Sequence, residues 1–553
     1  MNDEQAMTLK KLNIWLPLLF SLVLVAGMLI GTRMHNNPPT VAAIELPKKE
    51  ELPPSALGQG KLEELIRYIE ARYVDDVNKE ELVKEAIDNI LFQLDPHCSY
   101  ITAKQLKGVN EQLEGSFDGI GIEFVVVDDT VMVVAALAGG PAEKAGIRSG
   151  DKIVTIEDSL TVGDNIDYEG ILGKLKGERG SKIDIGIRRG DQKELIHFTI
   201  TRDKIPVHSV DVAYMLDDLT GYIKINRFSA NTYEEFMRAM EELVDRQGMK
   251  HLVMDLRQNG GGYLQEATNI LSQLFKEKDR LLVYTEGKSV TRSEYKSTGR
   301  NFYNIENIAV LTDEGSASAS EIIAGAIQDW DRGVIIGRRT FGKGLVQEQY
   351  RLRDGSAIRL TVARYYTPSG RCIQKPYDDR DHYDLDVAGR IENGELYDES
   401  KIEFLDTTQY FTNSGRVVYG GGGIRPDIFI PMDSLLLNPY YIRLNQHIPS
   451  FAFRYVEKYR DGLEKMQLEE FPGKFSVSED LANDFLKFVT ERGEKRNDRH
   501  WRTIKSGIKM AIKAGIARTL WSDKGYYYVM NAEDPAVRKA LKVVKDPQPL
   551  SLR

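Results

Sequence analysis

Three serines alternate with alanines in the segment Gly315–Glu321, which follows an apolar run, Ile308–Thr312, that predicts a buried strand. The apolar residues after the serines recur at helical spacing, so the serines lie at a turn from a strand to a helix. A serine in that place has an exposed hydroxyl, a helix N-terminus behind it and free backbone N–H groups nearby, as a nucleophile needs. Any one of these serines, taken alone, is more simply explained as a helix N-cap.

A lysine and an amide lie four residues apart further along the chain, at Lys343 and Gln347. The run Leu345–Leu352 alternates like a strand, and Asp354-Gly355 turns it into a second strand, Ala357–Tyr365, to form a hairpin. Because side chains along a strand point to alternate faces, we expect Lys343 and Gln347 on the same face. A lysine beside an amide, with a serine elsewhere, suggests a Ser-Lys nucleophile pair.

The segment Gly337–Gly344 nearly matches the phosphate-binding loop G-x-x-x-x-G-K-[ST]. Gly344 occupies the position where a hydroxyl must bind magnesium, and a strand follows instead of a helix. These two departures disfavour a nucleotide-binding enzyme.

A glycine run follows the predicted strand His251–Leu256, and a helix is predicted over Tyr263–Phe275. The run Gly260-Gly261-Gly262 exposes backbone N–H groups at a helix N-terminus, which is a natural site for an anion. A turn that needs one positive φ angle would explain one glycine but hardly three.

Together these segments resemble the carboxyl-terminal processing peptidases, which are tail-specific serine proteases of the PDZ-containing S41 type. The resemblance covers about residues 60–431. It rests on Asp-Leu-Arg followed by glycines (255–262), Ser-Ala-Ser-Ala-Ser-Glu (316–321) and Thr-Phe-Gly-Lys-Gly-x-Val-Gln (340–347), with further matches at 94–97, 366–371 and 423–427.

The resemblance assigns a role to five residues. Ser318 corresponds to the nucleophile, Lys343 to the general base and Gln347 to its supporting amide. The N–H groups of Gly262 and Ala319 correspond to the oxyanion hole. A lysine has a reference pKa of ~10.4 and acts as a base near neutrality only if burial removes its charge. Lowering that pKa by ~3 units costs about 4 kcal/mol, which an apolar pocket must supply.

Family members differ in the third catalytic group, and some rely on an aspartate at the position of Asp329. Cys98 stands where the family usually has serine, and Gly260 stands where proline is common; neither position carries a catalytic role. The resemblance implies no metal and no nucleotide or other cofactor.

Residues 115–204 resemble a PDZ domain, with a short helix over Pro141–Gly146 and a turn at Gly150-Asp151. In that family the segment Gly119-Ile120-Gly121-Ile122 is the carboxylate-binding loop. Glycines let consecutive N–H groups point at the terminal carboxylate of a peptide, and the edge strand beyond the loop accepts the peptide as an added strand. The implied partners are therefore proteins or peptides with free C-termini.

The segment Leu12–Thr32 contains no charged residue and has about the length of a membrane-spanning helix. Lys10 and Lys11 precede it, which places the short N-terminal tail in the cytoplasm. The sequence that follows is a poor cleavage site, so we interpret the segment as a retained signal-anchor, with a cleaved signal peptide as the alternative. We therefore expect an inner-membrane, single-pass protein whose catalytic part is periplasmic.

The overall composition excludes several classes of protein. The chain of 553 residues is 42% hydrophobic and 28% charged, which excludes wholesale disorder and a polytopic membrane protein. The 83 acidic and 74 basic residues form no long block of one sign, which argues against a nucleic-acid binder. Two cysteines cannot make a disulfide framework.

These patterns predict a multidomain α+β protein with a transmembrane anchor, a helical region, a PDZ-like β-rich domain, an α/β serine-peptidase core of the ClpP/crotonase type and a C-terminal helical extension. We interpret the extension as structural or oligomerising, with binding of substrate or an adaptor protein as the alternative. The expected limits are 1–34 for the tail and anchor, 35–59 for a linker, 60–114 for the helical region, 115–204 for the PDZ domain, 205–432 for the core and 433–553 for the extension.

Together the sequence and the resemblance predict a membrane-anchored, extracytoplasmic serine endopeptidase that cleaves proteins near or from their C-termini by a Ser-Lys mechanism. Its PDZ domain is expected to recognise the substrate C-terminus and to gate the activity. The alternative is a catalytically silent PDZ scaffold or adaptor. A silent scaffold would be expected to have lost the serine or the lysine, and both are present.

Overall fold

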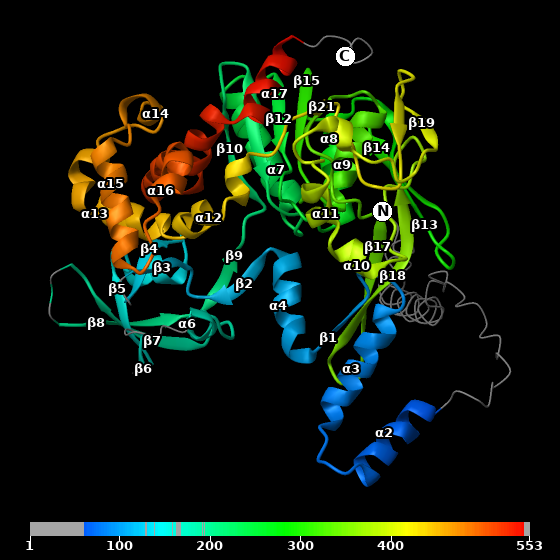
Figure 1. Cartoon of the computed structure of the whole chain (residues 1–553), viewed down its shortest axis with the longest axis horizontal. Coiled ribbons are helices and arrows are strands. Elements are labelled where there is room, and N and C mark those ends of the chain that lie inside the picture. The colour runs from blue at the N-terminus through cyan, green and yellow to red at the C-terminus, as the bar shows by residue number, and fades with distance from the viewer. Residues whose placement is uncertain are drawn as a thin grey trace, which may run out of the picture. The chain divides into compact units, whose positions relative to one another are not determined.

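The computed structural model describes residues 60–546 apart from 128–129, 138, 158, 162–167, 191 and 193 (Figure 1). The chain divides into two compact units, residues 1–86 and 87–553. None of the helices in the described part combines the length and apolar character of a membrane span. The predicted anchor over residues 12–32 lies outside the described residues.

The first unit contains helix α2 (Lys61–Arg72) and the start of helix α3 (Lys79–Phe92). The side-chain oxygen of Asn78 accepts the N–H groups of Glu80 and Glu81 at 3.1 and 3.3 Å. Asn78 therefore caps the beginning of α3.

A six-stranded sheet forms the centre of the second unit, in the order β10-β11-β12-β15-β16-β21. All neighbouring pairs are parallel except β10 with β11. Every residue of β11, β12 and β16 is buried, as expected for strands covered on both faces. The strands are β10 (Val210–Met215), β11 (Thr220–Ile225), β12 (His251–Asp255), β15 (Asn307–Thr312), β16 (Val334–Gly337) and β21 (Ile428–Phe429).

Helices cover both faces of this sheet (Figure 1). One face packs against α7 (Thr232–Met240, continued as a π-helix to Arg246), α8 (Leu264–Leu274) and α9 (Ala319–Asp329). The opposite face packs against the last helix of the chain, α17 (Pro535–Lys545), whose Val537 and Ala540 are fully buried. Residues 535–545 thus contribute to the core of the central sheet.

A second, antiparallel sheet carries the predicted hairpin, formed by β17 (Leu345–Arg351) and β18 (Ala357–Tyr366). Its order is β1-β18-β13-β14, with β17 also paired to β18. Its other strands are β1 (Ser99–Ile101), β13 (Lys278–Glu286) and β14 (Ser293–Thr298). Shorter elements near these sheets are α4 (Ala103–Glu114), α10 (Arg380–Asp384), α11 (Asp386–Glu392), β19 (Gln409–Phe411), β20 (Val417–Tyr419) and the 3₁₀ turn Glu399–Lys401.

A separate sheet has the strand order β3-β4-β5-β7-β8, with β6 also paired to β5, and β3 is one of its edge strands. This sheet has a hydrophobic core of its own. A ribbon of β2 and β9 leads into and out of it (Figure 1). Its elements are β2 (Ser116–Gly119), β3 (Ile122–Val127), β4 (Thr130–Ala136), α5 (Pro141–Ala145), β5 (Lys152–Ile156), β6 (Ser159–Leu160), α6 (Tyr168–Leu175), β7 (Lys182–Arg188), β8 (Ile196–Thr201) and β9 (Asp203–Pro206).

The C-terminal helices have a hydrophobic core of their own and also touch the edge strand β3. The Ser450 hydroxyl donates to the Val126 carbonyl at 3.2 Å, and Phe453 packs on Met132. The elements are the 3₁₀ turn Ser434–Leu437, α12 (Pro439–Asn445), α13 (Ile448–Leu463), α14 (Phe471–Lys474), α15 (Glu479–Glu491) and α16 (Asp498–Glu533), with non-helical backbone at Trp521 and Ser522.

The structure confirms the two predicted strand-to-helix turns, before α8 and before α9, and the hairpin β17–β18. It also confirms an α/β core accompanied by a β-rich domain. The packing of α17 on the central sheet was not predicted, because an amphipathic pattern shows that a helix buries one face without showing what lies against it.

Candidate active site

The glycine turn and the serine turn both follow the carboxyl ends of parallel strands. Strand β12 leads into the glycines, and β15, its neighbour in the sheet, leads into Ser318. Because neighbouring parallel strands end at the same edge of a sheet, the two turns meet there, in the usual place for a ligand site of this architecture.

Ser318 is the residue before helix α9 and has a strained backbone, with φ 54° and ψ −113°. Residues other than glycine rarely adopt a positive φ, and such strain is concentrated at functional sites. Its carbonyl accepts the N–H groups of Glu321 and Ile322 at 2.8 and 3.0 Å and the Tyr365 hydroxyl at 3.1 Å. The turn therefore holds the residue in this conformation.

The two serines beside Ser318 have structural partners. The Ser316 hydroxyl donates to the Leu256 carbonyl at 2.8 Å, and the Ser320 hydroxyl donates to the Asn259 carbonyl at 2.9 Å. Both serines are fully buried, whereas Ser318 lines a pocket. Because the hydroxyls of Ser316 and Ser320 are already bonded to carbonyls, Ser318 is the serine of this motif that is available as a nucleophile.

The glycine turn lies against Ser318 so closely that it has no space for a side chain. A Cβ atom on Gly261 would lie 2.7 Å from the Ser318 Cβ and 3.0 Å from the Ala319 nitrogen. Gly262 has a φ of 146° and passes directly over the Phe228 carbonyl. The N–H groups of Gly262 and Ala319 have no hydrogen-bond partner among the described residues, so both are available to a ligand.

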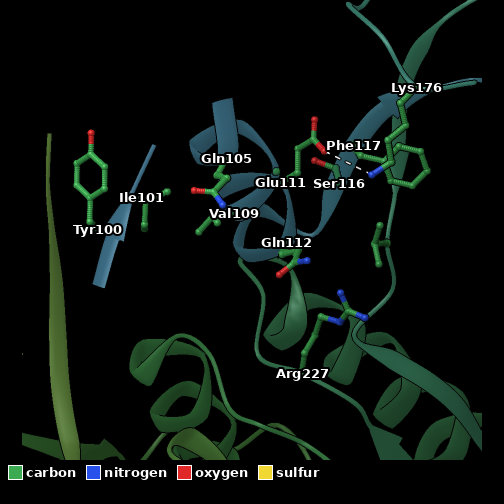
Figure 2. Close-up of a pocket in the computed structure, with 12 residues that line it drawn as sticks. Tyr100, Ile101, Gln105, Val109, Glu111, Gln112, Ser116, Phe117, Lys176 and Arg227 are labelled. Atoms are coloured by element: carbon green, nitrogen blue, oxygen red, sulfur yellow. Dashed lines mark ion pairs between the residues drawn. The ribbon is translucent and has the colours of Figure 1, made fainter. Parts of the chain in front are cut away.

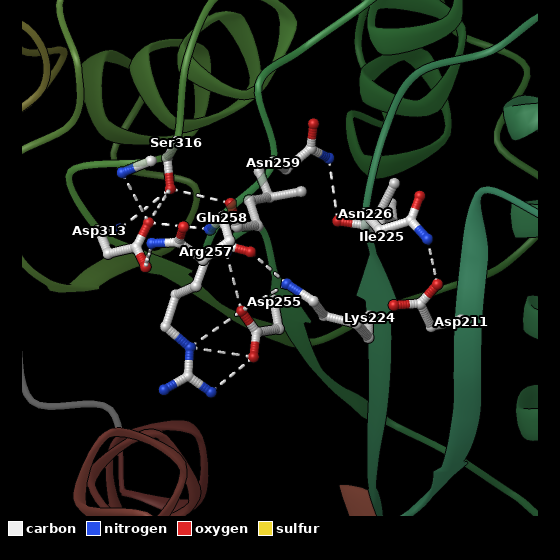
Figure 3. Close-up of polar contacts among 12 residues, drawn as sticks. Asp211, Lys224, Ile225, Asn226, Asp255, Arg257, Gln258, Asn259, Asp313 and Ser316 are labelled. Atoms are coloured by element: carbon white, nitrogen blue, oxygen red, sulfur yellow. Dashed lines mark hydrogen bonds and ion pairs between the residues drawn. The ribbon is translucent and has the colours of Figure 1, made fainter. Parts of the chain in front are cut away.

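Asn259 joins the two turns, and Figure 3 shows the surrounding contacts. Its side-chain oxygen accepts the Gly261 N–H at 2.9 Å, and its amide donates to the Ile225 carbonyl at 2.9 Å. Its own carbonyl accepts the Ala317 N–H at 2.9 Å. One buried side chain and its backbone therefore link both turns to the sheet.

A buried ion network lies beneath the glycine turn (Figure 3). The Asp255 carboxylate pairs with Arg257 at 2.6 Å and with Lys224 at 3.5 Å. Burial opposes this charge, but the two cations hold the pKa of Asp255 well below its usual range. Arg257 also pairs with Asp534 at 2.7 Å, at the start of α17, which connects the turn to the C-terminal helices.

Lys343 lies in the loop before β17, and its ammonium donates to the Gln347 side-chain oxygen at 3.0 Å. The expected contact is present, but Lys343 lies outside the strand and a β-bulge follows at Val346. Burial lowers the pKa of Lys343, with a smaller contribution from the charge of Arg359. The site thus favours the neutral amine that a general base requires.

The side chain of Gln347 is held by His97, a residue near the beginning of the second unit. Its amide nitrogen donates to the His97 carbonyl at 2.5 Å. The imidazole of His97 contacts the Tyr383 hydroxyl at 2.7 Å, and burial lowers its pKa to about 4. His97 is therefore neutral near pH 7 and supports the amide through its backbone.

A single pocket contains the residues that the sequence assigns to catalysis. It is lined by Ser318, Lys343 and Gln347 together with the three glycines of the turn. Among the described residues, no hydrogen bond joins the Ser318 hydroxyl to the Lys343 ammonium. Its other lining residues are Asn110, Leu113, Tyr263, Leu264, Gln265, Tyr295, Ile322, Leu345, Val346, Gln349, Arg359 and Tyr365.

The structure places Asp329 at the opposite end of α9 from Ser318. Its carboxylate forms a buried ion pair with Arg371 at 2.7 Å and accepts the Ser369 N–H at 2.9 Å. It does not line the pocket, so the structure brings Gln347, and not Asp329, to Lys343.

The segment Gly119–Ile122 leads into the edge strand β3. The Ile120 carbonyl accepts the Ala142 N–H at 2.9 Å, and the Gly121 carbonyl accepts the Leu137 N–H at 3.0 Å. An isolated β-bridge pairs Gly119 with Lys176 of the opposite segment, whereas the Gly121 N–H has no partner among the residues that the structure describes. The loop thus combines anchored carbonyls with one free donor beside a strand that has a strand neighbour on one side only.

Helix α4 borders both the serine pocket and a second hollow, and Figure 2 shows the residues that line the hollow. Asn110 and Leu113 of α4 line the serine pocket, whereas Glu111 and Gln112 line the hollow. Across the hollow, Glu111 forms an ion pair with Lys176 at 3.8 Å. The hollow therefore lies between the PDZ-like region and the helix that borders the active site.

Several residues that build the site were not predicted from the sequence. Asn259 and Glu321 belong to the motifs 255–262 and 316–321, but the resemblance assigned them no role. His97 acts through its backbone carbonyl, which leaves no signal in the sequence. For the described residues, no cluster of His, Cys, Asp and Glu is arranged to hold a metal ion.

Comparison with family models matches residues 219–381 to peptidase family S41 and residues 119–200 to the PDZ domain. Carboxy-terminal processing protease CtpB of Bacillus subtilis (strain 168) is 35% identical over 320 residues, 57% of this chain and 65% of that protein. The chain carries a peptidase domain of family S41. Residues 440–523 of the C-terminal helices match a family of unknown function (DUF8443).

Two further proteins resemble the part of the chain that includes the S41 domain. A probable CtpA-like serine protease of Staphylococcus aureus (strain MRSA252) is 33% identical over 315 residues, 57% of this chain and 62% of that protein. The solved structure of the photosystem II D1 C-terminal processing protease is 31% identical, covering 56% of this chain and 88% of that one, with a TM-score of 0.32. The matches span just under two thirds of the two curated relatives.

The close approach of Gly261 to Ser318 can be tested by a single methyl group. We expect Gly261→Ala to displace Ser318 and to slow its labelling by a fluorophosphonate by about 10²-fold, because small misplacements at a reacting group have effects of that size. Gly260→Ala is the matched control, since its Cβ would meet nothing within 4 Å. Equal labelling of the two variants would show that the contact does not constrain the serine.

Proposed function

We propose that this protein is a serine endopeptidase that uses Ser318 as nucleophile and Lys343 as general base. The observation that carries the proposal is their shared pocket, which joins a lysine of lowered pKa to Ser318, while the hydroxyls of the two neighbouring serines donate to backbone carbonyls. Membership of the S41 family supports the same chemistry.

The neutral amine of Lys343 accepts the proton of the Ser318 hydroxyl as the oxygen attacks the carbonyl carbon of a peptide bond. Gln347 accepts a hydrogen bond from Lys343 and holds its side chain in the pocket. Because the amide oxygen is uncharged, it orients the amine without stabilising the ammonium form as a carboxylate would.

The negative charge that develops on the substrate oxygen is stabilised by the N–H groups of Gly262 and Ala319. The protonated Lys343 then donates its proton to the leaving amine, and the acyl group stays on Ser318. Water attacks the ester and Lys343 takes a proton from that water. The bond between the acyl carbon and the Ser318 oxygen then breaks, the acid product leaves, and Lys343 passes the proton to the released serine oxygen.

Removing either member of the pair should abolish proteolysis without unfolding the chain. We expect Ser318→Ala and Lys343→Ala each to lose at least about 10³-fold in kcat/KM, and the double variant to be no worse than either, because residues that act as a unit are not additive. Hydrolysis of an unstructured protein measures the effect, and circular dichroism checks the fold. Full activity of Lys343→Ala would remove the lysine from the mechanism.

The protonation state of Lys343 can be tested through its neighbour. Activity should fall as the pH decreases through the pKa of Lys343, because the base is then protonated. Gln347→Glu places a negative charge next to the ammonium and should move that acidic limb upward by about 1–3 pH units. An unchanged limb in the pH profile of kcat/KM would mean that Lys343 does not control it.

We further propose that the PDZ domain recognises the free C-terminus of a substrate and gates the peptidase. The free N–H of Gly121 suits a carboxylate, and the side of β3 without a strand neighbour suits an added strand. Helix α13 contacts β3 through Ser450 and packs Phe453 on Met132 of β4, and Asp534, after α16, pairs with Arg257 just before the glycine turn. The C-terminal helices therefore touch both the PDZ sheet and the segment that leads into the oxyanion hole, which supports gating.

Recognition of the C-terminus predicts that amidation of a peptide substrate slows its cleavage by the intact enzyme. Gating predicts in addition that deletion of residues 115–204 unmasks activity on short peptides, whereas tethering alone predicts a raised KM that is confined to long ones. The measurement compares short and long peptides with free and amidated ends. Equal rates for both ends on the intact enzyme would contradict carboxylate recognition. A chain that binds these peptides but cleaves none would be the silent PDZ scaffold.

We also propose that residues 12–32 anchor the protein in the inner membrane with its catalytic part in the periplasm. The proposal rests on the uncharged segment and the lysines before it. The full-length protein should stay with membranes after a carbonate wash. Recovery of a soluble form that begins near residue 33 would instead indicate a cleaved signal peptide.

A further inference from the structure

A buried carboxylate next to the active site has no part in the proposed steps. Glu321 lies in the first turn of α9, three residues after Ser318, and its side chain is fully buried. A buried carboxylate is costly unless hydrogen bonds satisfy its oxygens, so its partners indicate why it is present.

Four donors surround the Glu321 carboxylate. One oxygen accepts the N–H groups of Ser318 and Lys343, at 2.9 and 2.8 Å. The other oxygen accepts the Gly342 N–H at 2.7 Å and the Thr340 hydroxyl at 2.5 Å. The backbones of the nucleophile and the base are therefore held by the same carboxylate oxygen.

An ordinary capping box accounts for only one of these contacts. A glutamate at this position commonly accepts the N–H of the residue that caps the helix, which here is Ser318. The other three donors come from the loop 340–343, which is distant in the sequence and carries the base. A helix cap alone has no need of that loop.

The loop that carries Lys343 depends on outside contacts for its conformation, because Lys343 has a glycine on each side and Gly342 has a φ of 91°. Glycines leave the backbone many conformations. The Tyr365 hydroxyl donates to the carbonyls of both Ser318 and Lys343, and the Phe341 N–H donates to the Ser316 carbonyl at 3.0 Å. Glu321 adds to these contacts the one side chain that accepts the N–H groups of both the nucleophile and the base.

We propose that Glu321 is a positioning residue that sets the distance and orientation between Ser318 and Lys343 for catalysis. This inference rests on the proposed function of that pair. Glu321 touches no substrate and acts through the backbones of the two catalytic residues.

The charge of Glu321 also reaches the base. Burial raises the pKa of Glu321 to about 7 against the opposing effect of its four donors, and its negative charge raises the pKa of Lys343. Replacing it by an uncharged side chain should therefore move the acidic limb of activity to lower pH. The guanidinium of Arg390 faces this site and donates to the Thr340 and Phe341 carbonyls. The other ionisable and charged groups that face it are Tyr365, Tyr383, Cys372, His97, Arg359 and Asp95.

The test is Glu321→Gln in the full chain, which keeps the size of the side chain but turns two acceptor positions into donors. We expect kcat to fall by about 10²-fold while KM for a peptide changes less than twofold, and the acidic limb to move to lower pH. A structural role alone would reduce the folded fraction and leave both kcat per folded molecule and the limb unchanged, and that result would overturn the proposal.

Asp217→Asn is the matched control, because the Asp217 carboxylate also accepts two backbone N–H groups, at the β10–β11 turn, away from the catalytic edge of the sheet. Its kcat and acidic limb should equal those of the wild type. If Glu321→Gln does not fold, Thr340→Val removes one donor and keeps the carboxylate. That variant should lower kcat severalfold, and an unchanged kcat would refute the positioning role.

The variant Ser318→Ala distinguishes a failure of the proposed peptidase function from a failure of the positioning role of Glu321. Equal activity of wild type and Ser318→Ala would overturn the proposed function and the positioning role with it. A wild type that depends on Ser318, together with wild-type kinetics in Glu321→Gln, would overturn the positioning role alone.

Discussion

The active site depends on two backbone turns packing together without an intervening side chain. Gly261 lies against Ser318 at a distance that excludes even a methyl group, and Asn259 ties both turns to the sheet. This close contact brings the Gly262 N–H near a serine that belongs to a different strand and helix. The parallel sheet makes the contact possible, because the adjacent strands β12 and β15 end at the same edge.

Buried carboxylates keep these turns in place, and one of them differs from the others in the kind of partner it has. Asp255 pairs with Arg257 and Lys224, and Asp329 pairs with Arg371. Glu321 has hydrogen-bond donors but no cation, which is why its pKa rises where that of Asp255 falls. Lys343 is also buried, but its side chain bonds to the Gln347 amide and not to a carboxylate. Burial therefore lowers the pKa of Lys343 and favours the neutral amine.

Much of the site could be predicted from the sequence because its chemistry lies in local motifs. The strand-to-helix turns, Ser318, and the contact of Lys343 with Gln347 follow from patterns a few residues long. What could not be predicted depends on contacts distant in the sequence. Examples are the His97 carbonyl on Gln347, the loop 340–343 on Glu321 and α17 on the central sheet. A pattern of apolar residues identifies a buried face but not its partner, and a backbone carbonyl has no side-chain signature.

The packing of α17 has a consequence for how the protein is made. One face of the central sheet is covered by α17 together with Tyr527 and Tyr528 of α16, whereas the strands and both catalytic turns are synthesised much earlier. At ~5–20 residues per second, the interval between residue 381 and α17 is on the order of ten seconds or more. During that interval the nucleophile and the base are carried on a sheet with one apolar face still exposed.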